Sequence, residues 1–189
     1  MNGSNGSNPV EQYKTYRSSS IGGNHSVTIC LIDEIVDQFG FGIKKSPLSI
    51  RNFIRWARNT FGEPVKNVLL MGKGLNYMQY RGNESNPDVE KLNLVPTFGE
   101  PASDNLLAAN PGEIIPQISI GRLSVINAEE VSVYLAKLIQ YEQQQAFQSP
   151  LIRDKAWLKN VVHVVGANDA LGEILKEAMV RYTTSISDT

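Results

Sequence analysis

The sequence predicts an α/β protein in which a parallel β-sheet has helices on both faces. Three observations lead to this fold class: apolar, β-branched runs of strand length, amphipathic stretches of helix length, and the alternation of the two along the chain. Such alternation calls for crossover connections, which join parallel strands. The predicted strands are residues 27–32, 66–71, 117–121 and 160–165.

Local signals mark the predicted helices. Ser46-Pro47 places a capping serine before a proline at the first helical position. Asn127 begins a later helix, and Glu130 completes a capping box there. Two further helices are expected at residues 10–17 and from about residue 170.

Apolar residues at helical spacing predict which helix faces are buried. Between the second and third strands the chain is rich in Pro, Gly and Asn, so residues 76–115 are expected to form a long loop region. The predicted buried residues of the three longer helices are Ile50, Phe53, Ile54, Ala57 and Phe61, then Val131, Leu135, Leu138 and Ile139, and finally Leu171, Ile174, Leu175, Ala178 and Tyr182.

Composition sets limits on function. A chain of 189 residues can bury one full hydrophobic core. A net charge of -1 gives no reason to expect nucleic acid or an anionic membrane as a partner. No apolar run approaches the roughly 20 residues that a membrane-spanning helix needs. Residues 1–9 are polar, with no signal-peptide pattern, and read as a flexible linker or the cut end of an expressed fragment.

Nucleophilic catalysis by cysteine would need a thiolate paired with a histidine. The chain offers Cys30, His25 and His163, and a single cysteine excludes an internal disulfide. Cys30 and His163 lie within predicted strands, where a buried, inert thiol and a hydrogen-bonded structural histidine are the favoured interpretations. His25 lies in a polar turn and is expected to be solvated. The chain therefore contains no convincing catalytic dyad.

Two other segments follow predicted strands, where ligands gather in an open parallel sheet. Gly72-Lys73-Gly74 could cradle a phosphate, but its spacing matches neither a P-loop nor a dinucleotide fingerprint, so a plain turn is favoured. Asp33 and Glu34 could bind a metal or cap the segment that follows, and capping is favoured. The identity of any metal stays open.

A set of motifs in fixed order resembles the gingipain family of cysteine peptidases, which includes the sortase-like peptidase of the type IX secretion system. The most specific is Ile120-Gly121-Arg122-Leu123-Ser124, a strand that leads into a capped helix. The other matching segments are residues 36–42, 50–53, 68–72, 95–97, 102–104, 127–130, 137–139 and 141–142.

The resemblance implies a caspase-like α/β catalytic unit of two subdomains, here truncated. Residues 10–149 would form most of the first, smaller subdomain, and residues 150–189 the opening strand and helix of the second. The family's catalytic histidine and cysteine would lie beyond Thr189, so the resemblance implies a non-catalytic N-terminal portion of a secreted or cell-surface peptidase. Its partners would be the rest of its catalytic domain and a protein or peptide substrate. Calcium is possible by resemblance only.

Two alternatives remain open at this point. The first is a degenerate, non-enzymatic scaffold or interaction module, which is weakly favoured by Lys73 where the family usually has an aspartate. The second is a flavodoxin-like or receiver-type binding domain, suggested by Asp33 at a predicted strand end.

Asp104 and Arg122 are the residues expected to line the cleft of the full-length peptidase or to hold its floor. Arg122 follows a strand and precedes a capped helix, so its guanidinium should emerge at the carboxyl edge of the sheet. An unpaired buried charge is very costly. The sequence therefore predicts that Arg122 and Asp104 form a planar, two-bond ion pair that fixes the long loop to the sheet.

Overall fold

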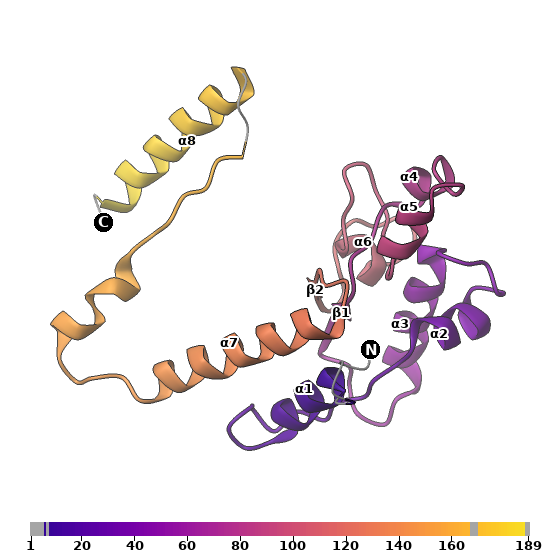
Figure 1. Cartoon of the computed structure of the whole chain (residues 1–189), viewed down its shortest axis with the longest axis horizontal. Coiled ribbons are helices and arrows are strands. Elements are labelled where there is room, and N and C mark those ends of the chain that lie inside the picture. Colours follow the sequence, from indigo (N-terminus) through magenta and orange to yellow (C-terminus); the bar gives the residue numbers. More distant parts are fainter. Residues whose placement is uncertain (1–5, 7, 167–169, 188–189) are drawn as a thin grey trace. The chain divides into compact units, whose positions relative to one another are not determined.

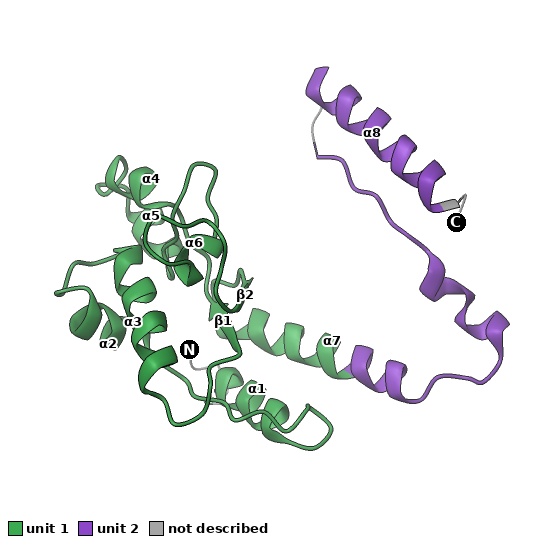
Figure 2. Ribbon diagram, turned by 180° about the vertical axis from the view of Figure 1, so that it is seen from behind, with its two compact units in different colours: residues 1–139 green, residues 140–189 purple. Residues whose placement is uncertain are grey.

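The computed structural model describes residue 6, residues 8–166 and residues 170–187. The chain divides into two compact units, residues 1–139 and residues 140–189 (Figure 2). Figure 1 labels the α-helices and strands, which are α1 (Pro9–Ser18), α2 (Ile32–Phe39), α3 (Pro47–Thr60), β1 (Asn67–Met71), α4 (Tyr77–Arg81), α5 (Pro87–Leu92), α6 (Asn105–Ala108), β2 (Ser119–Leu123), α7 (Ala128–Ala146) and α8 (Ala170–Ser187). The 3₁₀ helix η1 (Ile152–Lys159) lies between α7 and α8 in the sequence.

The sheet of the first unit confirms the predicted α/β class and the predicted parallel pairing. β1 and β2 lie side by side in parallel, with Val68 opposite Ile120 and Leu70 opposite Arg122. The chain between them, residues 72–118, contains three short helices and leaves β1 at the same edge of the sheet at which β2 ends. The groups that follow β1 can therefore meet the groups at the end of β2.

Two of the predicted strands are wrong within the described residues. Residues 25–31 run as an extended segment (Figure 1) but pair with no other strand, and Ile32 already begins α2. Residues 160–166 are also extended and unpaired, and Val162 is 81% exposed. Apolar, β-branched composition favours an extended backbone, but a strand also needs a neighbouring edge to which it can donate and from which it can accept hydrogen bonds.

The structure confirms the predicted start positions of α3 and α7. Asn127 Oδ1 accepts from the amide of Glu130 at 2.9 Å, and the Glu130 carboxylate accepts from the amide of Ile126 at 2.9 Å, so the N-terminus of α7 is capped reciprocally. α3 begins at Pro47 as predicted. Ser46, however, makes no side-chain cap; its carbonyl instead accepts the hydroxyl of Ser49 at 2.7 Å.

The expected loop region contains helices that the sequence prediction missed. α4 and α5 each follow an asparagine whose side chain caps the helix: Asn76 Oδ1 accepts from Gln79 at 2.7 Å, and Asn86 Oδ1 accepts from Asp88 at 3.0 Å. Asn86-Pro87 repeats the cap-then-proline pattern that located α3, so this signal was available in the sequence.

One face of the sheet carries the hydrophobic core of the first unit. Leu70 of β1 packs with buried side chains from α3, α6 and the connection between the strands, namely Ile50, Ile54, Val95 and Leu107. Leu107 is fully buried even though it lies in the four-residue α6. The core therefore depends on the irregular connection, which has to be held against the sheet.

Several expected buried faces hold and others do not. Val131 and Leu135 of α7 are buried, and Ile50, Ile54 and Ala57 of α3 are buried. Phe53 is half-buried, and Phe61 is exposed. In the second unit, α8 begins near the predicted residue, but the side chains of Leu171, Ile174, Leu175 and Tyr182 are exposed. The predicted burial on α8 is therefore wrong for these four residues.

We expect Leu107→Ala to lower the free energy of unfolding by about 2–5 kcal/mol, because it removes a fully buried side chain from the core. Urea denaturation followed by circular dichroism measures the change. Ile115→Ala, at a side chain that is 69% exposed, is the matched control and should change stability by no more than about 0.5 kcal/mol. Equal effects of the two substitutions would contradict the assignment of the core.

Candidate functional site

Arg122 lies in β2, opposite Leu70 of β1, and its guanidinium reaches the edge of the sheet where both strands end. Arg122 Nε donates to Asp104 Oδ2 at 2.8 Å, and Nη2 donates to Asp104 Oδ1 at 2.7 Å. Two parallel bonds of this kind match the fork of the guanidinium to the carboxylate. The predicted two-bond pair is confirmed. Whether the pair also lines a cleft in the full-length protein stays a prediction.

The remaining contacts of Arg122 were not predicted. Its Nη1 donates to the carbonyl of Gly72 at 2.5 Å and to the carbonyl of Val95 at 2.8 Å. The same site requires glycine at residue 74, because a Cβ there would lie 2.0 Å from the Val95 oxygen. Of these features, only Gly74 is visible in the sequence. Every residue has a backbone carbonyl, so the sequence does not indicate which carbonyls accept hydrogen bonds from Arg122.

The ion pair is largely removed from solvent. The Arg122 side chain is 13% exposed and that of Asp104 is 22% exposed. Burial alone would raise the pKa of the Asp104 carboxyl group. The hydrogen bonds and the positive charge of Arg122 outweigh burial and hold that pKa below its ordinary value of 3.8. Asp104 is therefore ionised in the folded protein near neutral pH.

The candidate nucleophile has the electrostatics of an unreactive thiol. Cys30 lies in the extended segment before α2 and reaches solvent, not the strand interior that the sequence suggested. Partial burial, and then the negative charge of Glu34, raise the pKa of its thiol above the ordinary value of 9.0. A reactive cysteine needs the opposite shift, because the thiolate is the nucleophile.

Neither histidine activates this thiol. Among the described residues, no hydrogen bond joins Cys30 to His25 or His163. His25 is solvent-exposed, as expected, and its amide donates to the carbonyl of Arg17 at 2.9 Å. His163 was expected to be a hydrogen-bonded structural residue. Its Nε2 is instead buried without a hydrogen-bond partner in the part of the chain that the structure describes.

The two other sequence candidates are structural. The amide of Gly72 donates to the Leu123 carbonyl at 2.9 Å, and the amide of Lys73 donates to the Val125 carbonyl at 2.9 Å. These two donors are therefore not free to bind a phosphate, which agrees with the interpretation of a plain turn. Asp33 and Glu34 lie in the first turn of α2, where negative charge stabilises a helix N-terminus.

Comparison with protein families places the chain in a peptidase family. The model of peptidase family C25 matches residues 4–188, nearly the whole chain. The chain belongs to peptidase family C25. Searches of curated proteins and of solved structures returned no match.

The C25 match identifies the chain as part of a cysteine peptidase family, the gingipain family, and agrees with the resemblance found in the sequence. The mixed helices and parallel strands are consistent with a caspase-like α/β fold. The flavodoxin-like alternative loses its basis, because Asp33 lies at the start of a helix and not at the end of a strand.

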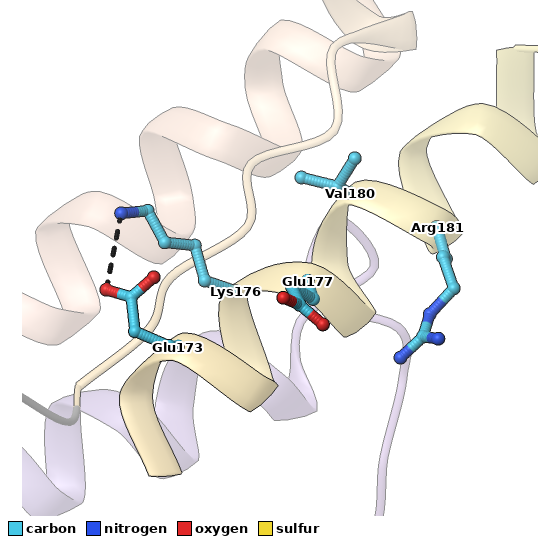
Figure 3. A pocket seen from close by; sticks show the side chains of 5 residues that line it. All are labelled: Glu173, Lys176, Glu177, Val180 and Arg181. Carbon is cyan, nitrogen blue, oxygen red and sulfur yellow. Dashed lines mark ion pairs between the residues drawn. The ribbon is translucent and has the colours of Figure 1, made fainter. Parts of the chain in front are cut away.

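Two hollows on the described surface lack the residues of a cysteine-peptidase site. One is an open depression along α8, and every residue that lines it comes from that single helix (Figure 3). An ion pair there joins Lys176 Nζ to Glu173 at 3.7 Å. The other lies in the first unit between α1 and the extended segment before α2, and neither is lined by a cysteine or a histidine.

The described residues also contain no group of three or more His, Cys, Asp or Glu side chains that could hold a metal ion. The helices of the described part were also checked for membrane-spanning potential, and none has the length and apolarity to cross a bilayer.

We expect Arg122→Ala to lower the free energy of unfolding by about 3–5 kcal/mol, because it strands a largely buried carboxylate. Denaturant unfolding gives the value. Arg81→Ala removes an exposed arginine that pairs with Glu84 and serves as the matched control, with an expected loss of at most about 1 kcal/mol. Arg122→Lys should also destabilise, since lysine lacks the planar fork. A loss at Arg122 no larger than at Arg81 would show that the pair contributes little.

The Asp104 pair also predicts how stability changes with pH. A carboxyl group whose pKa is lower in the folded state stabilises fully above its unfolded pKa, about 3.9, and this contribution disappears as the pH falls through the folded pKa. The free energy of unfolding should therefore decrease below about pH 4. Asp104→Asn should be less stable at pH 7 and should lose less on acidification. Asp88→Asn, at an exposed side chain, should keep the wild-type pH profile.

Proposed function

We propose that this chain is a non-catalytic portion of a C25 cysteine peptidase, and that the full-length protein hydrolyses peptide bonds through a Cys–His dyad located beyond Thr189. The observation that carries the proposal is the state of Cys30. Its pKa is raised by burial and by Glu34, and no histidine hydrogen-bonds it among the described residues. A C25 peptidase built on this chain needs its nucleophile elsewhere.

The second unit supports a role as the opening strand and helix of the second, caspase-like subdomain. Its extended valines, Val161, Val162 and Val164, are exposed, as are Leu171 and Ile174 of α8. Apolar side chains exposed over an extended segment and a helix leave the unit without a core of its own, which fits a unit that is completed by further chain. By family resemblance the full-length protein acts on protein or peptide substrates at the cell surface or after secretion.

The purified 189-residue chain should hydrolyse none of the fluorogenic arginyl, lysyl or broad-specificity peptides. A longer expression product that extends past Thr189 should hydrolyse them, and should lose activity when a cysteine in the extension is replaced. Cys30→Ala should leave the activity of the longer product unchanged. Activity of the 189-residue chain that disappears with Cys30→Ala would overturn the proposal. A folded but inactive longer product would favour the non-enzymatic interaction module.

The thiol itself provides an independent check. Alkylation of Cys30 by iodoacetamide should rise with pH to a midpoint above 9.0, because alkylation requires the thiolate. Glu34→Gln removes one of the charges that disfavour the thiolate, so it should speed alkylation at pH 8. The unfolded chain in urea is the reference and should react faster than the folded protein. A midpoint below that of the unfolded chain would mark Cys30 as an activated nucleophile.

A further inference from the structure

Three arginines of α3 form a row on one side of the helix. Arg51, Arg55 and Arg58 are separated by four and three residues, which places them on one helix face over about 10 Å. α3 contains no aspartate or glutamate, so this face carries only positive charge. All three side chains are half-buried and not fully extended into solvent.

None of the three guanidinium groups has a carboxylate partner. Within the described residues, no ion pair and no side-chain hydrogen bond involves Arg51, Arg55 or Arg58. Other arginines of the chain do pair: Arg81 with Glu84, and Arg153 with Asp154. α2 packs against α3, and no ion pair joins the two helices among the described residues.

Arg51 contacts an aromatic ring of the strand connection. Its guanidinium lies over the ring of Phe98 at 5.1 Å, a cation–π contact that fixes its position. Its Nε is buried and has no hydrogen-bond acceptor in the described part of the chain. Burial, and then the charge of Arg55, lower the pKa of Arg51. An anion bound between Arg51 and Arg55 would offset the repulsion between these two arginines.

The arginine face also carries an exposed apolar side chain. Leu48 lies three residues before Arg51, on the same side of α3, and is 45% exposed. Arginine is one of the side chains most enriched in the energetically dominant parts of protein interfaces. A ligand of matching chemistry carries negative charges together with apolar groups.

We propose that the row Arg51–Arg55–Arg58 of α3 is a docking surface for an acidic polypeptide segment that carries apolar side chains. Charge complementarity selects this partner, because three unpaired guanidinium groups on one helix face attract a run of carboxylates, and guanidinium groups bind carboxylates with two bonds. Nucleic acid fits less well, since it needs a broad basic surface and this chain has a net charge of -1. The inference does not depend on where the catalytic dyad lies.

Fluorescence anisotropy tests the proposal with the 189-residue chain and a labelled synthetic peptide in which glutamate alternates with leucine and alanine. The matched peptide has glutamine at every glutamate position. The acidic peptide should bind at least about tenfold more tightly than the glutamine peptide, with affinity that falls as salt is added. Arg55→Gln combined with Arg58→Gln should weaken binding by about tenfold or more. Arg81→Gln, outside the row, should leave binding unchanged.

Circular dichroism of the variants controls for folding, and Arg55→Lys separates charge from the two-bond geometry. Equal binding of the acidic and glutamine peptides would overturn the proposal, as would acidic-peptide binding that survives the double substitution. Single-stranded DNA and phosphatidylserine vesicles are assayed in parallel. If either competes with the acidic peptide at comparable charge concentration, the surface is a general polyanion site and the assignment to a polypeptide fails.

Discussion

The fold of the first unit depends on the side chain of Arg122. The guanidinium of Arg122, in β2, donates to the carbonyl of Gly72, which directly follows β1. It also binds two points of the connection between the strands, the carbonyl of Val95 and the carboxylate of Asp104. The connection contains only short helices, which cannot hold themselves in place. Leu107, three residues after Asp104, is fully buried in the core. The ion pair thus determines whether the connection can deliver its apolar side chains to the sheet.

Features that follow from neighbouring residues could be read from the sequence. The start of α3 at Pro47 and the cap of α7 by Asn127 and Glu130 are set within a single turn, so the local sequence contains all the relevant groups. The pairing of Arg122 with Asp104 was also predictable, because a charge at an enclosed strand end requires a counter-charge and the loop offered a carboxylate.

Features that depend on distant groups could not be read in this way. The runs 27–32 and 160–165 have strand composition, but their backbone has no neighbouring edge in the described structure, and hydrogen-bonded pairing is what makes an extended segment a strand. The carbonyls of Gly72 and Val95 likewise become acceptors for Arg122 only because the fold brings this arginine to them. Arg122 lies 50 residues after Gly72 and 27 residues after Val95 in the sequence. The identity of a side chain does not indicate whether its segment pairs as a strand or whether its carbonyl accepts a distant hydrogen bond.

The donor count of the arginines distinguishes structural from binding surfaces. A guanidinium has five N–H donors, and Arg122 uses four of them in contacts within the protein. Both oxygens of Asp104 also accept hydrogen bonds from Arg122, so few donors or acceptors remain for a substrate at this carboxyl edge of the sheet. This favours a structural role for the pair.

The arginines of α3 present the opposite case. Their donors have no acceptors among the described residues, and one of their nitrogens is already desolvated. Of these two groups of arginines, the row on α3 is therefore the one with donors left to bind an anion.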